Sequence, residues 1–316
     1  MSKSSLSYLI QITLLIITMT FVLDKVIYLS INKISKQVYT GQTGGKLNQY
    51  LKQNSDLNFI VFGSSRANHH IDPEKIDSKS FNMGMDGTKI VYSNTLIKLL
   101  PKNKKQTVLL HISPKNSFNS EYHGEDISKL STLYHQNDIV RNEIKNFKQN
   151  KLIQDFFWCQ IYNNSALGII KNYFMPKYDY KTYFGFDPLI VSKEQNKIFS
   201  LVLEKWKPQN CSTNIELNPV YKSSLSDLKE FCKDNNKTLI LYTSPIYRDD
   251  CKEDDIKLTE ILKKEGFIYW NYSDFFKSDN SLENWKDNTH LSNIGADLFT
   301  QEIKNRINQI NETAMP

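Results

Sequence analysis

Cysteine pairs, charge blocks and repeats are scarce in this sequence, and their scarcity argues against several classes of protein. The four cysteines are widely spaced and form no C-x-x-C pair, which argues against a zinc site of the common kind. The 40 basic and 34 acidic residues leave a formal charge of only +6, and the lysines are scattered. Nucleic acid is therefore not an expected partner. The chain also lacks internal repeats and low-complexity tracts.

The sequence leaves the state of the cysteines open. Disulfides would suit a domain outside the cytoplasm, but the spacing does not select a pairing. Because unpaired cysteine is among the most buried residue types, we favour ordinary buried thiols over bridges at Cys159, Cys211, Cys232 and Cys251.

Apolar and aromatic residues are plentiful enough for a sizeable core. The chain has 316 residues, of which 40% are hydrophobic, and it contains 17 Tyr and 17 Phe. This composition is typical of a globular protein rather than a disordered one. The length fits one large domain or two small ones.

One long apolar run lies near the amino terminus. Leu6 to Leu23, LSYLIQITLLIITMTFVL, carries no charge and would form a helix of roughly 27 Å, just enough to cross a bilayer. No A-x-A-like cleavage site follows, so we expect an uncleaved anchor rather than a cleaved signal or a buried soluble helix. Lysines flank both ends of the run, so the positive-inside rule selects no orientation.

The chain is expected to divide into an anchor at residues 1–25, a polar connector at 26–56, a globular domain at 57–310 and a tail at 311–316. The connector contains TGQTGGK at residues 40–46, which is typical of a flexible segment.

Short apolar runs alternate with helical patterns along the globular domain. Continuous β-rich runs predict strands buried on both faces, and they cover residues 58–64, 106–113, 237–245 and 266–273. Helical patterns cover residues 88–100, 221–235, 254–265 and 292–310. This alternation indicates βαβ units. We expect an α/β fold with a doubly wound, flavodoxin-like parallel sheet of about five strands and flanking helices.

A long insertion interrupts this alternation. Residues 116–219 are rich in aromatic, Asn and Lys residues. An insertion of this kind between core strands is expected to form a cap over the carboxyl ends of the strands. Its aromatic residues could line a groove for sugar or acyl groups, but a small core of the insertion's own is the favoured interpretation.

Two separated motifs carry candidate chemistry. In FIVFGSSRANHHI, residues 59–71, an apolar strand ends at a glycine and two serines; in NWKDNTHLSNIGADLF, residues 284–299, Asp287 and His290 precede a helix. A serine nucleophile needs a base to take its proton and a carboxylate to orient that base. One of these two serines, together with His290 and Asp287, therefore forms a candidate catalytic triad.

These motifs resemble the SGNH, or GDSL-like, hydrolase family. That family carries its serine in a G-D-S block after the first strand and its acid and base in a D-x-x-H block before the last helix. The resemblance implies that Ser65 is the nucleophile, His290 the base and Asp287 the orienting acid. FNMGMDGT, residues 81–88, resembles the family's second block, whose glycine donates a backbone N–H to the oxyanion. That glycine would be Gly84, acting together with the Ser65 N–H.

Two features depart from the family pattern. Ser64 stands where the family has the aspartate of G-D-S. The G-x-N-D block is absent, so the family's third oxyanion donor, an Asn side chain, has no clear counterpart; Asn116 lies at about the right place. Arg66, Tyr247 and Arg248 are candidates for contacting the substrate.

The adjacent residues His69 and His70 invite comparison with a metal site. Neighbouring histidines point in different directions, and no carboxylate or cysteine cluster accompanies them. We expect a surface or supporting role instead, and no metal or cofactor.

The resemblance implies acyl chemistry on esters. Anchored proteins of this kind include acetyltransferases of exopolysaccharide pathways and the D-alanine transfer protein of teichoic acid synthesis. We expect a single-pass cell-membrane protein whose domain is extracytoplasmic, periplasmic or extracellular, and which transfers or hydrolyses an acyl group, acetyl above all, on a cell-surface glycan. The implied partners are that glycan, an acyl donor, a membrane-bound O-acyltransferase and the bilayer. The alternatives are a non-catalytic glycan-binding or scaffold subunit and, less favoured, a soluble lipase or peptidase.

Overall fold

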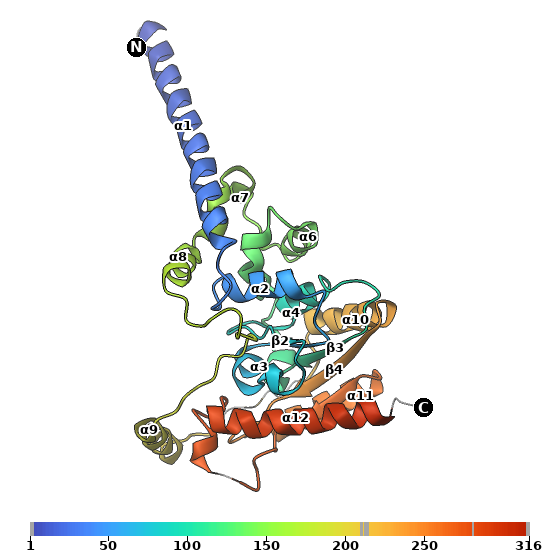
Figure 1. Ribbon diagram of the computed structural model, residues 1–316. Coiled ribbons are helices and arrows are strands. Elements are labelled where there is room, and N and C mark those ends of the chain that lie inside the picture. Colours follow the sequence, from blue (N-terminus) through green and yellow to red (C-terminus); the bar gives the residue numbers. More distant parts are fainter. Residues whose placement is uncertain (1–2, 209–210, 212–214, 280, 314–316) are drawn as a thin grey trace. The chain divides into compact units, whose positions relative to one another are not determined.

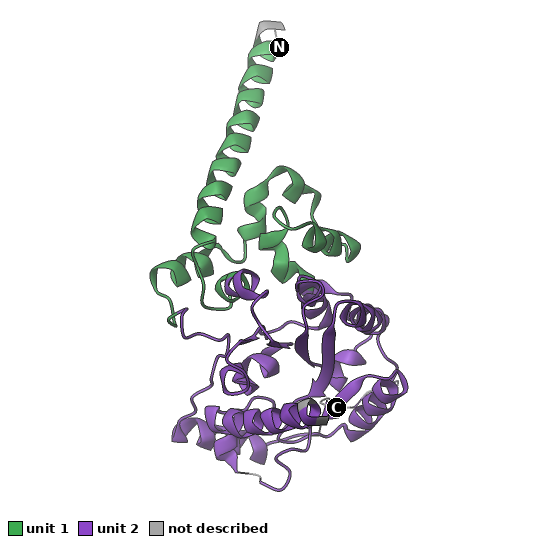
Figure 2. Ribbon diagram, turned by 45° about the vertical axis from the view of Figure 1, so that its right-hand side comes forward, with its two compact units in different colours: residues 1–48, 127–179 green, residues 49–126, 180–316 purple. Residues whose placement is uncertain are grey.

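The computed structural model describes residues 3–208, 211, 215–279 and 281–313. The chain divides into two compact units, which Figure 2 shows in different colours. Unit 1 comprises residues 1–48 and 127–179, and unit 2 comprises residues 49–126 and 180–316.

Unit 2 contains a five-stranded parallel sheet. Its strands follow the spatial order β2-β1-β3-β4-β5, and every neighbouring pair is parallel. The strands are β1 (Phe59–Phe62), β2 (Ser80–Asn82), β3 (Gln106–His111), β4 (Lys237–Thr243) and β5 (Ile268–Asn271). The predicted α/β fold is confirmed at this level.

Strand β2 was not among the expected strands. It has only three residues, with one apolar side chain between a serine and an asparagine. A segment this short cannot display either an alternating pattern or an apolar run. Its pairing with β1, with Phe59 opposite Ser80 and Val61 opposite Asn82, is decided by tertiary structure.

Helices flank this sheet. In Figure 1, α4 and α10 lie on one side of β3 and β4, and α12 lies on the other. The four expected helices of the domain are present, each within three residues of its predicted ends. The helical segments lying wholly in unit 2 are α3 (Ser65–His70), η1 (Pro73–Lys75), α4 (Ile90–Ile97), α5 (Pro114–Ser117), α9 (Lys193–Glu204), α10 (Pro219–Asp234), α11 (Lys252–Lys264), η4 (Leu282–Asn284) and α12 (Asn293–Thr313).

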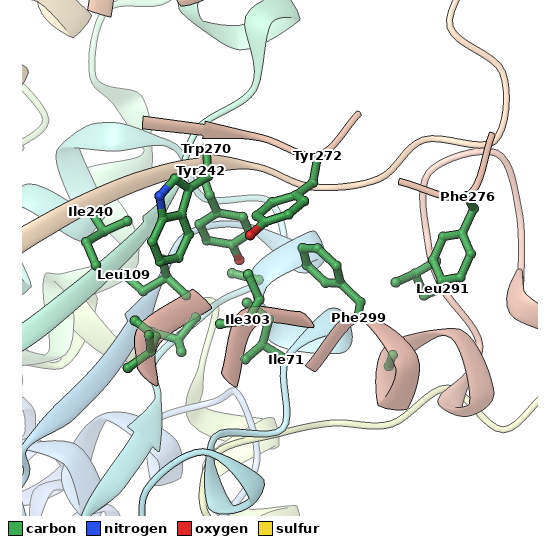
Figure 3. Packing of buried hydrophobic residues seen from close by; sticks show 14 of the residues in the cluster. Ile71, Leu109, Ile240, Tyr242, Trp270, Tyr272, Phe276, Leu291, Phe299 and Ile303 are labelled. Carbon is green, nitrogen blue, oxygen red and sulfur yellow. The ribbon is translucent and has the colours of Figure 1, made fainter. Parts of the chain in front are cut away.

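A large apolar cluster lies between the sheet and α12 (Figure 3). Side chains from β3, β4 and β5 meet Phe299 and Ile303 of α12 there. The cluster also includes Ala67, two residues after Ser65, and Leu291, next to His290. Both segments that carry the candidate triad are therefore fixed by core packing, which restricts side-chain motion.

Unit 1 is helical in its described residues. The long helix α1 (Lys3–Ser35) contains the apolar run, whose side chains are exposed, and it is long and apolar enough to cross a membrane. The other helices lying wholly in unit 1 are α6 (Asp138–Asn146), α7 (Leu152–Phe156), η3 (Trp158–Tyr162) and α8 (Ala166–Phe174). Two further segments, α2 (Gly45–Gln53) and η2 (Glu125–Leu133), cross the boundary between the units.

Three predicted segments differ from the structure. The connector at 26–56 is largely helical, because α1 continues to Ser35 and α2 follows, with Lys46 and Tyr50 fully buried. The insertion at 116–219 does not form one lobe: residues 127–179 belong with α1, and residues 180–219 belong with the sheet. The tail begins later than expected, because α12 runs to Thr313, and residues 314–316 lie outside the described residues.

Candidate active site

The end of β1 turns sharply so that a serine begins the next helix. Gly63 has φ of +139°, and a Cβ atom there would lie 2.6 Å from the His111 Cβ, so only glycine fits. Ser64 is the N-cap of α3, and Ser65 is its first residue. The Ser65 N–H therefore belongs to the first helical turn, whose amides have no acceptor within the helix.

The structure brings the three predicted triad residues together. The Ser65 hydroxyl donates to His290 Nε2 over 2.8 Å. On the other side of the ring, His290 Nδ1 lies 3.0 and 2.9 Å from the two carboxylate oxygens of Asp287. Because Nδ1 faces a carboxylate, it carries the proton, and Nε2 is left as the acceptor for the serine.

Asp287 stays ionised in this arrangement. Burial alone would raise its pKa, but hydrogen bonds from the His290 ring and from the backbone N–H groups of Thr289 and His290 lower the pKa to about 2. A permanent carboxylate at this position fixes the imidazole tautomer and would stabilise an imidazolium if the ring took a proton from the serine.

His70 holds the segment that carries His290. Its ring is fully buried, and Nε2 accepts the backbone N–H of Leu291 over 3.0 Å. Nε2 is thus unprotonated, so Nδ1 carries the proton and donates to the Ser244 hydroxyl over 2.5 Å. Burial, followed by the nearby charges of His290 and Arg66, lowers the pKa of His70 well below its usual value. Neutral His70 therefore links Ser244, which follows β4, to the segment that carries His290.

His69 is also buried rather than on the surface. Its Nδ1 donates to the Asp187 carbonyl over 2.6 Å, and its Nε2 lies 3.2 Å from an Asp86 carboxylate oxygen. Within the described residues, no group of three or more His, Cys, Asp and Glu side chains could hold a metal ion. The supporting role expected for the two histidines fits these contacts, and the surface location does not.

The backbone N–H of Gly84, the predicted oxyanion donor, has a hydrogen-bond partner within the protein. Its backbone N–H donates to Asn82 Oδ1 over 2.8 Å, so in this conformation that N–H is not directed at an oxyanion beside Ser65. A Cβ atom on Gly84 would lie 2.4 Å from the Asn68 backbone nitrogen of α3. Glycine is needed here for close packing.

Asn82 is a site-supporting residue that the sequence did not reveal. Its buried Nδ2 donates to the carbonyls of Ala67 and Ile71, each over 2.7 Å, and thereby clamps α3. Asn82 and Gly84, two residues of the stretch 81–88, thus both pack against the helix that begins with Ser65.

A cavity of about 540 Å³ opens beside the triad at the carboxyl ends of β3, β4 and β5. Arg66, which follows Ser65, lines it together with Asn288 and Thr289, which lie between the acid and base of the triad. Asn116 also lines this cavity. The remaining lining residues are Ser113, Pro114, Lys115, Phe118, Asn119, Ser120, Cys211, Thr243, Ile246, Arg248, Asp249, Asp250, Cys251, Asp254, Asp255 and Ser273.

The predicted substrate contacts divide into two groups. Arg66 and Arg248 line the cavity, and Arg248 is held by an ion pair with Asp250 at 3.2 Å. Tyr247 is partly buried and packs against the apolar cluster, with ring centroids 5.3 Å from Phe199 and 5.6 Å from Trp285. Tyr247 is not among the residues that line this cavity.

An acidic pair lies in the wall of the cavity. Burial raises the pKa of Asp255 to about 6, and a hydrogen bond shared with Asp249 contributes in the same direction. Lys252 Nζ lies 3.2 Å from Asp249 and 3.6 Å from Asp255. Burial acts against ionisation of Asp249 as well, but the hydrogen bond from Asp255 and the neighbouring Lys252 lower the pKa of Asp249. The proton that the pair takes up as pH falls through about 6 therefore goes to Asp255.

Two of the four cysteines form a disulfide at the rim of this cavity. Cys211 and Cys251 are bonded, with their Cα atoms 5.4 Å apart. Cys159 and Cys232 are free thiols. The favoured interpretation of four thiols is wrong for this pair, because 40 residues separate the two cysteines in sequence and only folding brings them together.

A smaller, mainly apolar cavity of about 330 Å³ lies on the α9 side of the triad carboxylate. Ile198, Phe199 and Val202 of α9 line it, together with Asp287 and Asn288. No pattern in the sequence placed this helix beside Asp287, because its position depends on how the insertion folds back.

Comparisons with known proteins leave the family open: no family model matches the chain, and no curated protein matches it.

Proposed function

We propose that the chain is a membrane-anchored, SGNH-like serine O-acyltransferase or esterase that uses Ser65, His290 and Asp287. The observation that carries this proposal is the continuous hydrogen-bond path from the Ser65 hydroxyl through the His290 ring to Asp287. Its distances match those expected between a nucleophile, its base and an orienting acid. The strand order β2-β1-β3-β4-β5 supports the doubly wound, flavodoxin-like arrangement in which such a site lies at the carboxyl ends of the strands.

The chemistry follows from the geometry. Ser65 Oγ attacks the carbonyl carbon of an ester while His290 Nε2 takes the hydroxyl proton. His290 then gives that proton to the leaving alkoxide, and the C–O bond of the ester breaks to leave an acyl-serine. Water or a sugar hydroxyl attacks this acyl-serine, with His290 taking its proton and returning it to Ser65. Hydrolysis and transfer thus share one site.

The oxyanion of each tetrahedral intermediate needs hydrogen-bond donors. The Ser65 N–H and the Asn116 side chain are the two candidates, because Asn116 lies in the cavity wall and the Gly84 N–H is bonded to Asn82. Loss of one such donor typically lowers the rate by about 10²–10³.

The cavity supports a polar acceptor. Its lining of hydroxyl, amide and carboxylate groups suits the hydroxyls of a cell-surface glycan, with acetyl as the favoured acyl group. The disulfide supports an oxidising, extracytoplasmic location. The apolar helix α1 supports attachment to the cell membrane. A membrane-bound O-acyltransferase that delivers the acyl group remains part of the proposal through the resemblance alone.

Labelling by a fluorophosphonate probe tests the triad. The detergent-solubilised full chain should be labelled, and Ser65→Ala or His290→Ala should abolish labelling while leaving circular dichroism unchanged. Ser64→Ala is the matched control, because Ser64 is the adjacent serine and lies outside the triad. Labelling that persists in Ser65→Ala would refute the assignment of the nucleophile.

A second test measures function in the cell. A strain carrying only Ser65→Ala should lose acylation of its surface glycan. Unchanged acylation in that strain would overturn the acyltransferase proposal.

One observation favours a second candidate, a non-catalytic glycan-binding or scaffold subunit. The Gly84 N–H, which the resemblance makes an oxyanion donor, is already hydrogen-bonded to the Asn82 side chain. In addition, the sequence has no G-x-N-D block to supply the Asn donor of the family. A folded wild-type chain that no phosphonate labels, but that binds the glycan, would support this candidate.

A further inference from the structure

The short helix α7 presents apolar side chains to solvent. Leu152 is 80% exposed, Phe156 is 64% exposed and Ile153 is 47% exposed. Three large apolar side chains on a five-residue helix form a concentrated exposed patch, which is unusual on a surface that faces only water.

This patch is joined directly to α1. Asp24 is 4% exposed, and its carboxylate accepts the backbone N–H groups of Trp158 and Cys159 over 2.8 and 3.0 Å. Lys25 Nζ donates to the Phe156 carbonyl and lies 4.4 Å from the ring centroids of both Phe21 and Trp158. The segment that follows α7 is therefore fixed against α1 at Asp24 and Lys25.

The height of this junction along α1 is set by the sequence. The uncharged run ends at Leu23, and Asp24 is the first charge after it. The ring of Phe157 packs against Phe21, inside the uncharged run, with centroids 6.4 Å apart. The helix α7, which immediately precedes Phe157, is thus level with the end of the apolar run, where the hydrocarbon region of a bilayer would end.

Two lysines lie on the amino-terminal side of this patch, and one acidic residue, Asp155, lies within α7. Lys148 and Lys151 are exposed and flank α7 on its amino-terminal side. Exposed apolar side chains bordered by lysines suit the boundary between acyl chains and anionic headgroups.

From these contacts we propose that α7 lies in the interface of the bilayer spanned by α1 and forms a second membrane contact through Leu152, Ile153 and Phe156. This inference rests on the membrane anchor in the proposed function and is independent of the triad. The occupant of the patch is lipid of that same membrane. Contact with the bilayer through both α1 and α7 would fix the orientation of unit 1. With α1 alone in the bilayer, unit 1 could rotate about the axis of that helix.

Helix α8 provides an internal contrast. Trp158 contacts α1 at Asp24. From there the chain runs along α1 towards its carboxyl end, where Tyr162 donates to Asn32 over 3.0 Å. Helix α8 follows at Ala166, and Figure 1 shows it further from the amino terminus of α1 than α7 is. Leu167 on α8 is 84% exposed, almost the same as Leu152. The two leucines therefore differ in height along α1 and not in exposure or residue type.

Lipid-dependent quenching of a fluorophore tests the proposal on this matched pair. The full chain with Cys159→Ser and Cys232→Ser is labelled at Leu152→Cys or at Leu167→Cys with an environment-sensitive dye. It is then placed in nanodiscs of phosphatidylethanolamine and phosphatidylglycerol. Acyl chains that carry a nitroxide near the headgroup should quench the dye at 152 several-fold more than the dye at 167, and aqueous iodide should show the reverse preference.

Equal quenching at the two positions, or stronger iodide quenching at 152, would overturn the proposal. A label at Phe156→Cys serves as the second variant should Leu152→Cys misfold. Release of the wild-type chain from membranes by carbonate would overturn both this proposal and the anchor. The phosphonate experiment in detergent would still decide the triad separately, so the two failures are distinguishable.

Discussion

Replacement of His70 by alanine should damage both stability and the candidate active site. In the folded chain, His70 Nε2 accepts the Leu291 N–H and its Nδ1–H donates to the Ser244 hydroxyl. His70→Ala removes both partners from a fully buried position. The Leu291 N–H then loses its acceptor one residue away from His290, the proposed base.

The size of the effect follows from these two bonds. Each buried polar group left without a partner costs about 1–3 kcal/mol, so the free energy of unfolding should fall by about 2–6 kcal/mol before any cavity term is added. Without the hydrogen bond from Leu291 to His70, the His290 ring would be less firmly positioned at 2.8 Å from the Ser65 hydroxyl. A misplacement near 1 Å typically costs about 10²-fold in rate, and the rate of phosphonate labelling should fall accordingly.

The pH dependence of stability gives a second readout. Because the pKa of folded His70 lies well below the usual 6.5, the unfolded chain takes up a proton below pH 6.5 that the folded chain does not. This residue therefore lowers stability as pH falls through 6.5, by up to about 1.4 kcal/mol per pH unit. In His70→Ala this contribution disappears, so the difference between variant and wild type should shrink towards acid pH.

Thermal unfolding in detergent and the labelling rate are the assays. His123→Ala is the matched control, because His123 is exposed and such a change should stay within about 0.5 kcal/mol. His70→Gln should recover part of the loss, since its amide oxygen can accept the Leu291 N–H. If His70→Ala unfolds and reacts like His123→Ala, the positioning role of His70 is refuted.

Three further predictions concern packing, charge and the disulfide. Gly84→Ala should cost about 1–3 kcal/mol, because its Cβ would lie 2.4 Å from the Asn68 nitrogen; wild-type thermal stability would contradict this. Burial raises the pKa of Asp255 from 3.8 to about 6. The contribution of Asp255 to the free energy of unfolding is therefore fully present below pH 3.8 and is lost as pH rises through 6. Asp255→Asn should abolish this dependence in melts recorded from pH 4 to 7, and an unchanged pH profile would count against it. Loss of the Cys211–Cys251 bridge, which closes a separation of 40 residues, should cost about 4 kcal/mol by chain entropy; a reduced chain that melts like the oxidised one would exclude this.

The fold was readable from the sequence where strands and helices are long and continuous. The apolar runs that became β1, β3, β4 and β5, and the helices between them, could be placed because buried parallel strands leave uninterrupted apolar stretches. Strand β2 and the helical connector could not. Ser80–Asn82 is too short to show a period, and the burial of Lys46 and Tyr50 comes from their tertiary neighbours.

The candidate triad was also readable, because nucleophile, acid and base each require a particular residue type. Sequence could name Ser65, Asp287 and His290, and folding brought together residues up to 225 positions apart. Supporting residues carry no such signal. An asparagine that clamps a helix or a histidine that accepts one backbone N–H looks, in a sequence, like any other.

The sequence alone thus determined that this is an α/β chain with a long apolar amino-terminal helix and a serine, a histidine and an aspartate at opposite ends of its domain. Tertiary structure alone decided that Gly84 packs against α3 and donates its N–H to Asn82, that the Tyr247 ring packs against Trp285, and that Cys211 meets Cys251. The reason is physical. Periodicity and residue chemistry are local properties of a chain, whereas the direction of one N–H group, the partner of one thiol and the burial of one ring depend on distant segments packing together.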